Sequence, residues 1–185
     1  MPQQVLKPGE FRVSDLPTRR PTRFELHPDA EARTAIAERL NLSSLRKLRF
    51  EGEISPSGAR GWTLTATLGA TVVQPCVVTL DPVTTRIDET VQRVYLPADL
   101  LDEAESGAET EMPEDTSTEP LGHVISAHDA MIESLSLSLP QYPRADEADL
   151  GDAVFAEDGV TPLRDEDTKP FAGLAGLRDK LDKKS

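Results

Sequence analysis

Two runs of alternating apolar and polar residues, joined by a short turn, constrain the fold of this chain more than any other feature. From Lys47 to Ile54 every second residue is apolar or glycine, and the same period returns from Trp62 to Leu68. Residues 55–58, between the two runs, are rich in turn-forming types. A period of two is that of a β-strand with one face buried. We therefore expect an antiparallel β-hairpin with its apolar residues on the core side.

Further strands and two helices are expected around this hairpin. Residues 11–13 and 22–26 read as short strands, and residues 83–96 read as a long one. Apolar residues at helical spacing predict amphipathic helices near residues 29–41 and over about 123–136. The expected fold class is α+β: an antiparallel β-sheet of about five or six strands with two main helices packed on it. We expect these elements to form a single domain, residues 1–143.

Two acidic segments are expected to stay outside the core. Residues 97–120 are rich in Asp and Glu and contain no Lys or Arg, which predicts a disordered insertion. Residues 144–185 are interpreted as an acidic linker followed by a flexible C-terminal tail. No apolar run approaches the length of a membrane span, and the first residues lack the apolar region of a signal peptide. We therefore expect a cytoplasmic protein without membrane contact.

Charge is divided unevenly along the chain. The net charge is −13, yet residues 1–60 hold 11 Lys and Arg against 8 Asp and Glu, a net of +3. Residues 61–185 therefore carry −16. An acidic protein is a poor candidate for wrapping naked nucleic acid, because such binding gains mostly from neutralising phosphates. A local phosphate contact, by contrast, needs only a local cluster of cations.

Two such basic clusters occur in the first sixty residues. One consists of Arg19, Arg20 and Arg23, and the other of Arg46, Lys47 and Arg49. Each is either a set of ordinary solvated side chains or a surface that contacts RNA or a protein partner. The sequence leaves both interpretations open.

The sequence contains no constellation that supports catalysis, a cofactor or a metal ion. It has no Gly-rich phosphate loop and no G-x-S-x-G elbow. His123 and His128 are five residues apart and do not share a helical face, and the single cysteine excludes a multi-cysteine zinc site within one chain. That cysteine, Cys76, lies among valines and is expected to be a small buried residue rather than a reactive thiol. We expect no enzyme, no cofactor and no metal.

Three segments together resemble one known family. Residues 73–83, with Cys76 and Leu80, are similar to the cysteine-centred motif of the bacterial YceD family, the large ribosomal RNA subunit accumulation proteins. The segment ending at Pro140 resembles that family's helix ending in A-L-P. The closing residues 169–177 resemble its terminal N-P-F-A-x-L-A-x-L-K signature and include Pro170, Phe171, Leu174 and Leu177.

The resemblance covers about residues 45–181 and implies a cytosolic, non-catalytic factor needed for accumulation of large-subunit rRNA, and hence for ribosome assembly. Many members of the family carry a C-x-x-C pair, but here Thr79 stands in place of the second cysteine. Metal binding is therefore not implied for this chain.

The charge asymmetry suggests how such a factor would meet its partner, a ribosomal precursor. The basic clusters would contact rRNA, and the acidic half would screen a basic ribosomal protein. The alternative is a protein–protein interaction adaptor that uses its C-terminal apolar motif and makes no direct contact with rRNA.

That motif contains a narrow apolar ridge. Phe171, Leu174 and Leu177 are spaced three apart and would lie on one side of a helix. Gly173 and Gly176 each weaken such a helix by about 1 kcal/mol relative to Ala, and a helix this short is unstable alone in water. The tail therefore needs a surface to dock on, either its own domain or a partner.

Replacing Phe171, Leu174 and Leu177 with Ser is expected to leave thermal unfolding nearly unchanged and to abolish partner capture, because the acidic linker would make the tail a tethered element. Melting followed by circular dichroism and an affinity pull-down measure the two effects. A large fall in melting temperature would show instead that the ridge packs on its own domain.

Overall fold

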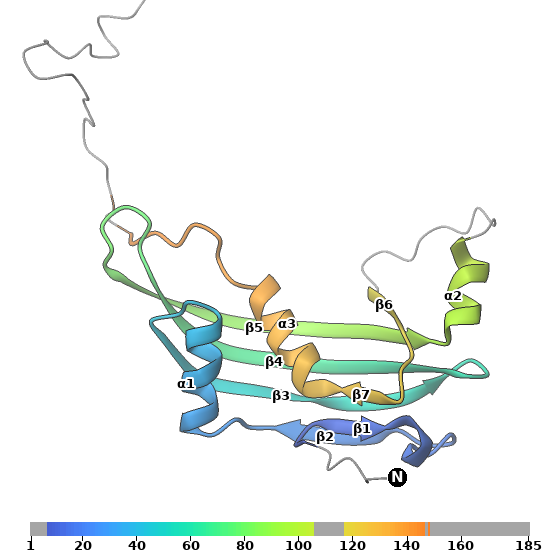
Figure 1. Ribbon diagram of the computed structural model, residues 1–185. Coiled ribbons are helices and arrows are strands. Elements are labelled where there is room, and N and C mark those ends of the chain that lie inside the picture. Colours follow the sequence, from blue (N-terminus) through green and yellow to red (C-terminus); the bar gives the residue numbers. More distant parts are fainter. Residues whose placement is uncertain (1–6, 106–116, 147, 149–185) are drawn as a thin grey trace, which may run out of the picture. The chain divides into compact units, whose positions relative to one another are not determined.

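The expected β-hairpin forms the centre of the fold. The structure, a computed structural model, describes residues 7–105, 117–146 and 148. Strands β3 (Ser44–Ser57) and β4 (Gly61–Pro75) form the hairpin, and β5 (Pro82–Leu96) pairs along the other side of β4 (Figure 1). The large core-side residues of both strands are buried, as the period of two predicted, and Phe50, Ile54, Leu64 and Leu68 are completely so.

Every helix and strand that the structure describes belongs to one compact unit, Met1–Asp146. The middle of the expected disordered insertion, residues 106–116, lies outside the described residues. Residues 149–185, with the expected apolar ridge, lie outside them as well.

The main sheet has five strands in the order β2-β3-β4-β5-β6, with β2 at Thr22–Leu26 and β6 at Ser117–Pro120. Its first three pairings are antiparallel, but β6 runs parallel to β5. The prediction of a purely antiparallel sheet is therefore wrong, and the sheet is mixed. After β5 the chain makes a long crossover before it returns along the same edge, and a crossover of this kind produces a parallel neighbour.

The expected disordered insertion is ordered at both of its ends. Helix α2 (Ala98–Glu105) begins directly after β5, and β6 occupies the other end. An ion pair between Arg60, in the turn between β3 and β4, and Asp99 ties the start of α2 to the hairpin. The disorder prediction was based on composition, and composition does not show these long-range pairings.

A second, two-stranded antiparallel sheet is formed by β1 (Glu10–Arg12) and β7 (Val124–Ser126), and a short 3-10 helix, η1 (Val13–Asp15), follows β1. The helix expected over about 123–136 begins only at Ala127, as α3 (Ala127–Leu137). The three residues before it pair with β1, and the Ser126 side chain caps α3 by accepting a hydrogen bond from the Asp129 backbone N–H at 3.1 Å.

The remaining helix, α1 (Ala30–Arg39), lies close to its predicted position. Its N-cap is Asp29, whose carboxylate accepts a hydrogen bond from the Ala32 backbone N–H at 2.8 Å. None of the helices in the described residues is long and apolar enough to cross a membrane.

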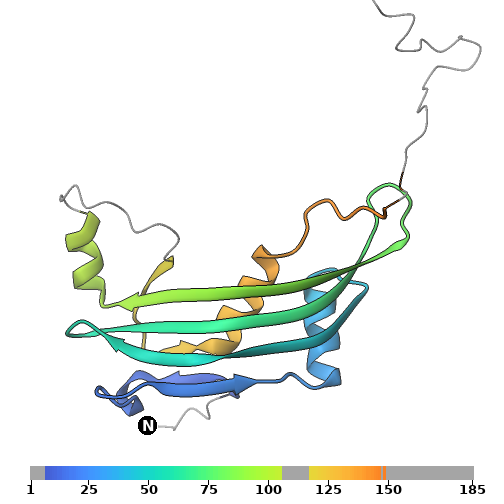
Figure 2. The same cartoon turned by 180° about the vertical axis from the view of Figure 1, so that it is seen from behind.

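These elements cover only one face of the five-stranded sheet. Helices α1 and α3 and the β1–β7 pair lie on the same side, where Ile36, Ile125, Met131 and Leu135 join the apolar core (Figure 1). Seen from behind, the strands themselves form the surface, with no described helix in front of them (Figure 2). We call this uncovered side the open face.

A buried arginine joins three elements on the core side. Arg93 of β5 is only 5% exposed, and its guanidinium pairs with two carboxylates. Its Nη1 donates to Glu119 of β6 and, at 2.8 Å, to Glu133 of α3. The paired carboxylates compensate the cost of removing the cation from water, and the arrangement fixes β6 against the sheet edge.

Arg93→Ala is expected to lower the free energy of unfolding by about 2–3 kcal/mol, because it removes a buried side chain and the charge-assisted hydrogen bonds that it donates to Glu119 and Glu133. Arg60→Ala is the matched control. It breaks the pair with Asp99, in which both side chains are more than half exposed, and should cost less than about 1 kcal/mol. Urea denaturation measures both. Equal losses would contradict the role assigned to Arg93.

Candidate functional site

The basic cluster at residues 46–49 lies at one end of the open face. Residues directly opposite one another in a sheet point to the same side. Arg46, Thr71 and Arg86 stand opposite one another on β3, β4 and β5, and Arg49, Gly69 and Asp88 form the next row. The structure thus adds Arg86 to the three cations that the sequence singled out.

A β-bulge in β3 shapes this end of the sheet. The register of β3 on β4 shifts between Arg46 and Arg49, and the backbone of Lys47 has a positive φ of 51°. The bulge lets Leu45 and Leu48, three residues apart, both face the core, since an extra residue restores the alternation. As a result, Arg46, Lys47 and Arg49 are all exposed within four positions of one strand.

A glycine makes room for the two arginines beside the bulge. A Cβ atom on Gly69 would lie 2.6 Å from Arg49 Nε and 2.9 Å from Arg86 Nη2. Both guanidinium groups therefore pass directly over the backbone of Gly69. Lys47, Arg49, Thr71 and Arg86 line a shallow hollow of about 260 Å³ at this place. Because Gly69 has no side chain, it leaves room for the side chains of Arg49 and Arg86 at this place.

One carboxylate holds the two arginines together. Arg86 forms a two-pronged ion pair with Asp88, with Nε donating to Oδ2 at 2.7 Å, and Arg49 Nη2 lies 3.8 Å from Oδ1 of the same group. The hydrogen bond from Arg86, and then the charges of Arg86 and Arg49, lower the pKa of Asp88. The cluster of Arg46, Lys47, Arg49 and Arg86 thus contains four cations and one firmly ionised anion.

The other basic cluster is not continuous with this one. Arg19 and Arg20 are exposed in the segment before β2, and Arg23 of β2 lies 3.7 Å from Glu53. The paired residues Glu25 and Glu51 lie on the open face between Arg23 and Arg49. The six cations predicted as contacts therefore form two separate groups, with carboxylates between them.

Sequence reasoning missed Arg86 because it could not fix the pairing of β4 with β5. In the sequence, Arg86 only interrupts the alternation of a strand. The register that places it opposite Thr71 is set by the length and folding of the loop at residues 76–81. The sequence did hold a signal for this pairing: the number of residues between Thr71 and the loop equals the number between the loop and Arg86.

The loop at residues 76–81 is built around Cys76. The thiol is fully buried, and its sulfur accepts hydrogen bonds from three backbone N–H groups, those of Val78 at 3.4 Å and of Thr79 and Ala145 at 3.5 Å. The Val77 N–H donates to the Pro143 carbonyl at 2.9 Å. Cys76 thus ties the loop to the segment after α3.

These hydrogen bonds change the acidity of the thiol. The Thr79 side chain, and then the backbone N–H groups of Thr79, Ala145 and Val78, lower the pKa of Cys76 from 9.0 to about 6, against the opposing effect of burial. Thr79, which stands where the resemblance would place a second cysteine, is therefore the main stabiliser of the thiolate. No cation is required.

The other residues of the expected family motif lie in or near this loop where they are described. Leu80 has a positive φ of 65° and is 76% exposed. The Pro140 carbonyl accepts a hydrogen bond from Gln74 Nε2 at 3.2 Å, which holds the end of the α3 segment on β4. Pro170, Phe171, Leu174 and Leu177 lie outside the described residues.

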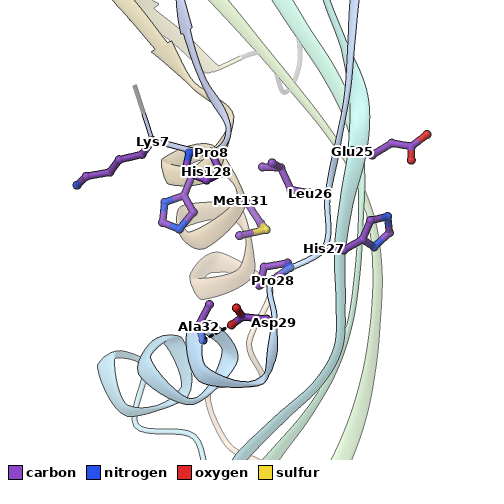
Figure 3. Close-up of a pocket in the computed structure, with 10 residues that line it drawn as sticks. All are labelled: Lys7, Pro8, Glu25, Leu26, His27, Pro28, Asp29, Ala32, His128 and Met131. Atoms are coloured by element: carbon purple, nitrogen blue, oxygen red, sulfur yellow. Dashed lines mark hydrogen bonds between the residues drawn. The ribbon is translucent and has the colours of Figure 1, made fainter. Parts of the chain in front are cut away.

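A second hollow, of about 630 Å³, opens on the core side of the molecule between α3 and the β2–α1 connection (Figure 3). Its titratable side chains do not converge. Glu25 and His27 point away from His128 and Met131, and Asp29 is engaged in capping α1 (Figure 3). Within the described part of the chain, no three His, Cys, Asp or Glu side chains form a cluster that could hold a metal ion.

The fold and these surfaces define a small α+β protein built on a long β-meander, with a cationic cluster on its open face and a cysteine-centred loop at one end of the sheet. The family model "Large ribosomal RNA subunit accumulation protein YceD" matches residues 64–178. Because this match spans well over half of the chain, the protein belongs to the YceD family. No curated protein and no solved structure matches the chain.

The thiolate makes the stability of the fold depend on pH. The pKa of Cys76 is lower in the folded state than in the unfolded state, so ionisation of the thiol stabilises the fold. This stabilisation is fully present above the unfolded pKa of 9.0 and is lost as the pH falls through about 6. The difference in unfolding free energy between the wild type and Cys76→Ala should therefore grow between pH 6 and pH 9. Urea denaturation under reducing conditions measures it.

Thr79→Val is the control, because it removes the hydroxyl and keeps the sulfur and the shape of the side chain. It should reduce the pH dependence without abolishing it. A Cys76→Ala effect that is the same at every pH would contradict a thiolate in the folded state.

Proposed function

We propose that this protein is a non-catalytic accessory factor in large ribosomal subunit biogenesis, which supports accumulation or processing of 23S rRNA in the cytoplasm. The observation that carries the proposal is membership of a family named for accumulation of large-subunit rRNA. The cations that gather at the hollow on the open face support a binding role.

The partner in this proposal is a ribosomal precursor, in the form of rRNA, a basic ribosomal protein, or both. The separation of charge supports such a partner. The cations at residues 46–49 face solvent on the open face, whereas residues 61–185 carry a net charge of −16. Long-range attraction of this kind speeds association and orients the partner.

The alternative is an adaptor that binds only protein through its C-terminal apolar motif. The sequence pattern of Phe171, Leu174 and Leu177 favours this alternative, because on a helix these residues would form an apolar ridge in a segment rich in charged residues. Crosslinking in cells separates the two proposals. Adducts to rRNA support the first, and adducts to proteins alone support the second.

Reversing the six cations Arg19, Arg20, Arg23, Arg46, Lys47 and Arg49 to Glu is expected to reduce co-sedimentation with ribosomal precursors, because each reversal replaces attraction to phosphate with repulsion. In cells depleted of the wild-type protein, the variant should also fail to restore the ratio of 23S to 16S rRNA. Unchanged sedimentation at low salt would contradict the rRNA contact. A normal 23S level in depleted cells would contradict the proposed function itself.

A further inference from the structure

The cationic cluster of Arg46, Lys47, Arg49 and Arg86 has the geometry of an anion site. Its four positive charges belong to two strands that are not neighbours, β3 and β5, with β4 between them. Only the pairing of all three strands brings them together. Arg49 is half exposed and Arg86 is 41% exposed, so solvent reaches both guanidinium groups.

Two backbone features set the shape of this site. The bulge at Lys47, with its positive φ, adds a third cation beside Arg49 on the same strand. Gly69 has no side chain and so lets the guanidinium groups of Arg49 and Arg86 lie close together over its backbone. Bulges and strained backbone conformations cluster at functional sites, where they help to set the geometry. Both features here act on the same hollow.

The charge balance at this site favours an added anion. Asp88 neutralises one of the four cations, which leaves three positive charges within the cluster, bordered by Glu25 and Glu51, on a protein whose net charge is −13. Lys47 has no ion pair within the described residues, and Arg46 bonds only the hydroxyl of Ser44, at 3.4 Å. Guanidinium groups in a fixed fork suit phosphate oxygens in particular.

The open face also indicates what kind of phosphate would fit. Its described strand residues include no aromatic side chain on which an unpaired base could stack: Phe24, Phe50, Trp62 and Tyr95 are buried, and the exposed Tyr142 lies outside the strands, in the segment after α3. Threonines line the same face of β4, at Thr65, Thr67 and Thr71. Recognition without stacking is typical of double-stranded RNA, whose backbone is read through phosphate contacts and shape.

We infer that the hollow lined by Lys47, Arg49, Thr71 and Arg86 binds the phosphodiester backbone of an RNA duplex, with Gly69 allowing the two guanidinium groups to lie side by side beneath it. This inference rests on the proposed function and identifies its rRNA contact. The carboxylates Glu25 and Glu51 beside Arg49 limit the footprint to two or three phosphates. Binding is therefore weak, salt-dependent and independent of base sequence.

The test measures binding of the full-length protein to an RNA hairpin of about two helical turns by fluorescence anisotropy over a range of salt concentrations. Lys47→Gln, Arg49→Gln and Arg86→Gln together should weaken binding about tenfold at low salt and reduce the salt slope by about 2, since each phosphate contact contributes about 0.9. The matched control changes Arg19, Arg20 and Arg23 to Gln. It removes the same charge and should change affinity less than about twofold.

Gly69→Ala tests the geometry without changing any charge. The three atoms nearest to the added methyl group belong to the side chains of Arg49 and Arg86, which can move aside, so the fold should be retained and urea denaturation should confirm it. Affinity for the hairpin should fall several-fold. Wild-type affinity in this variant, or an equal loss in the two triple variants, would overturn the site, because either result means that only overall charge matters.

Two further probes decide the class of ligand. A single-stranded RNA of equal length should bind more weakly than the hairpin, and a polyglutamate peptide should not compete with it. Tighter binding of the single strand, or full competition by the peptide, would overturn the assignment to duplex phosphate. Co-sedimentation and rescue of 23S rRNA separate the two proposals. If the wild type and the triple variant at Lys47, Arg49 and Arg86 both co-sediment with precursors and both restore 23S rRNA, the site is wrong and the proposed function stands. If wild type does neither, the proposed function fails.

Discussion

Burial of one face of the β3–β4–β5 meander is the interaction on which the rest of the structure depends. Phe50, Ile54, Leu64 and Leu68 have no exposed surface, and α1, α3 and the β1–β7 pair all pack on the side that these residues define. Apolar burial of this kind is the dominant favourable term in folding. Side chains alternate between the two faces of a strand, so burying one set in the core places the other set on the opposite side. That opposite side is the open face.

The same constraint produces the cationic cluster. Leu45 and Leu48 are both buried on the core side, and the bulge at Lys47, where φ is positive, makes this possible. The displaced side chains then gather on the open face, where β5 contributes Arg86 across Gly69. The candidate RNA-contacting surface is thus a consequence of how the core is packed. Just beyond the same end of β4, Cys76 accepts hydrogen bonds from backbone N–H groups and so closes the loop that sets the register of β5.

Local sequence patterns predicted the elements that depend on local interactions. The hairpin, the long strand at residues 82–96 and helix α1 lie within a few residues of their expected positions, because period and capping residues act over short separations. The parallel strand β6, the helix α2 and the strand β7 were not predicted. Each is stabilised by contact with a distant segment: β6 pairs with β5, β7 pairs with β1, and α2 is linked to the β3–β4 turn by an ion pair. Such contacts cannot be read from composition.

The sequence by itself determined the α+β class, the buried face of the hairpin, the uneven charge and the family resemblance that the family model confirms. These properties reside in residue types and short spacings. Only the tertiary structure decided that six predicted cations form two groups, that Arg86 joins one of them and that Thr79 stabilises the Cys76 thiolate. Strand register, bulges and loop closure fix these relations, and they arise from packing between segments far apart in the chain.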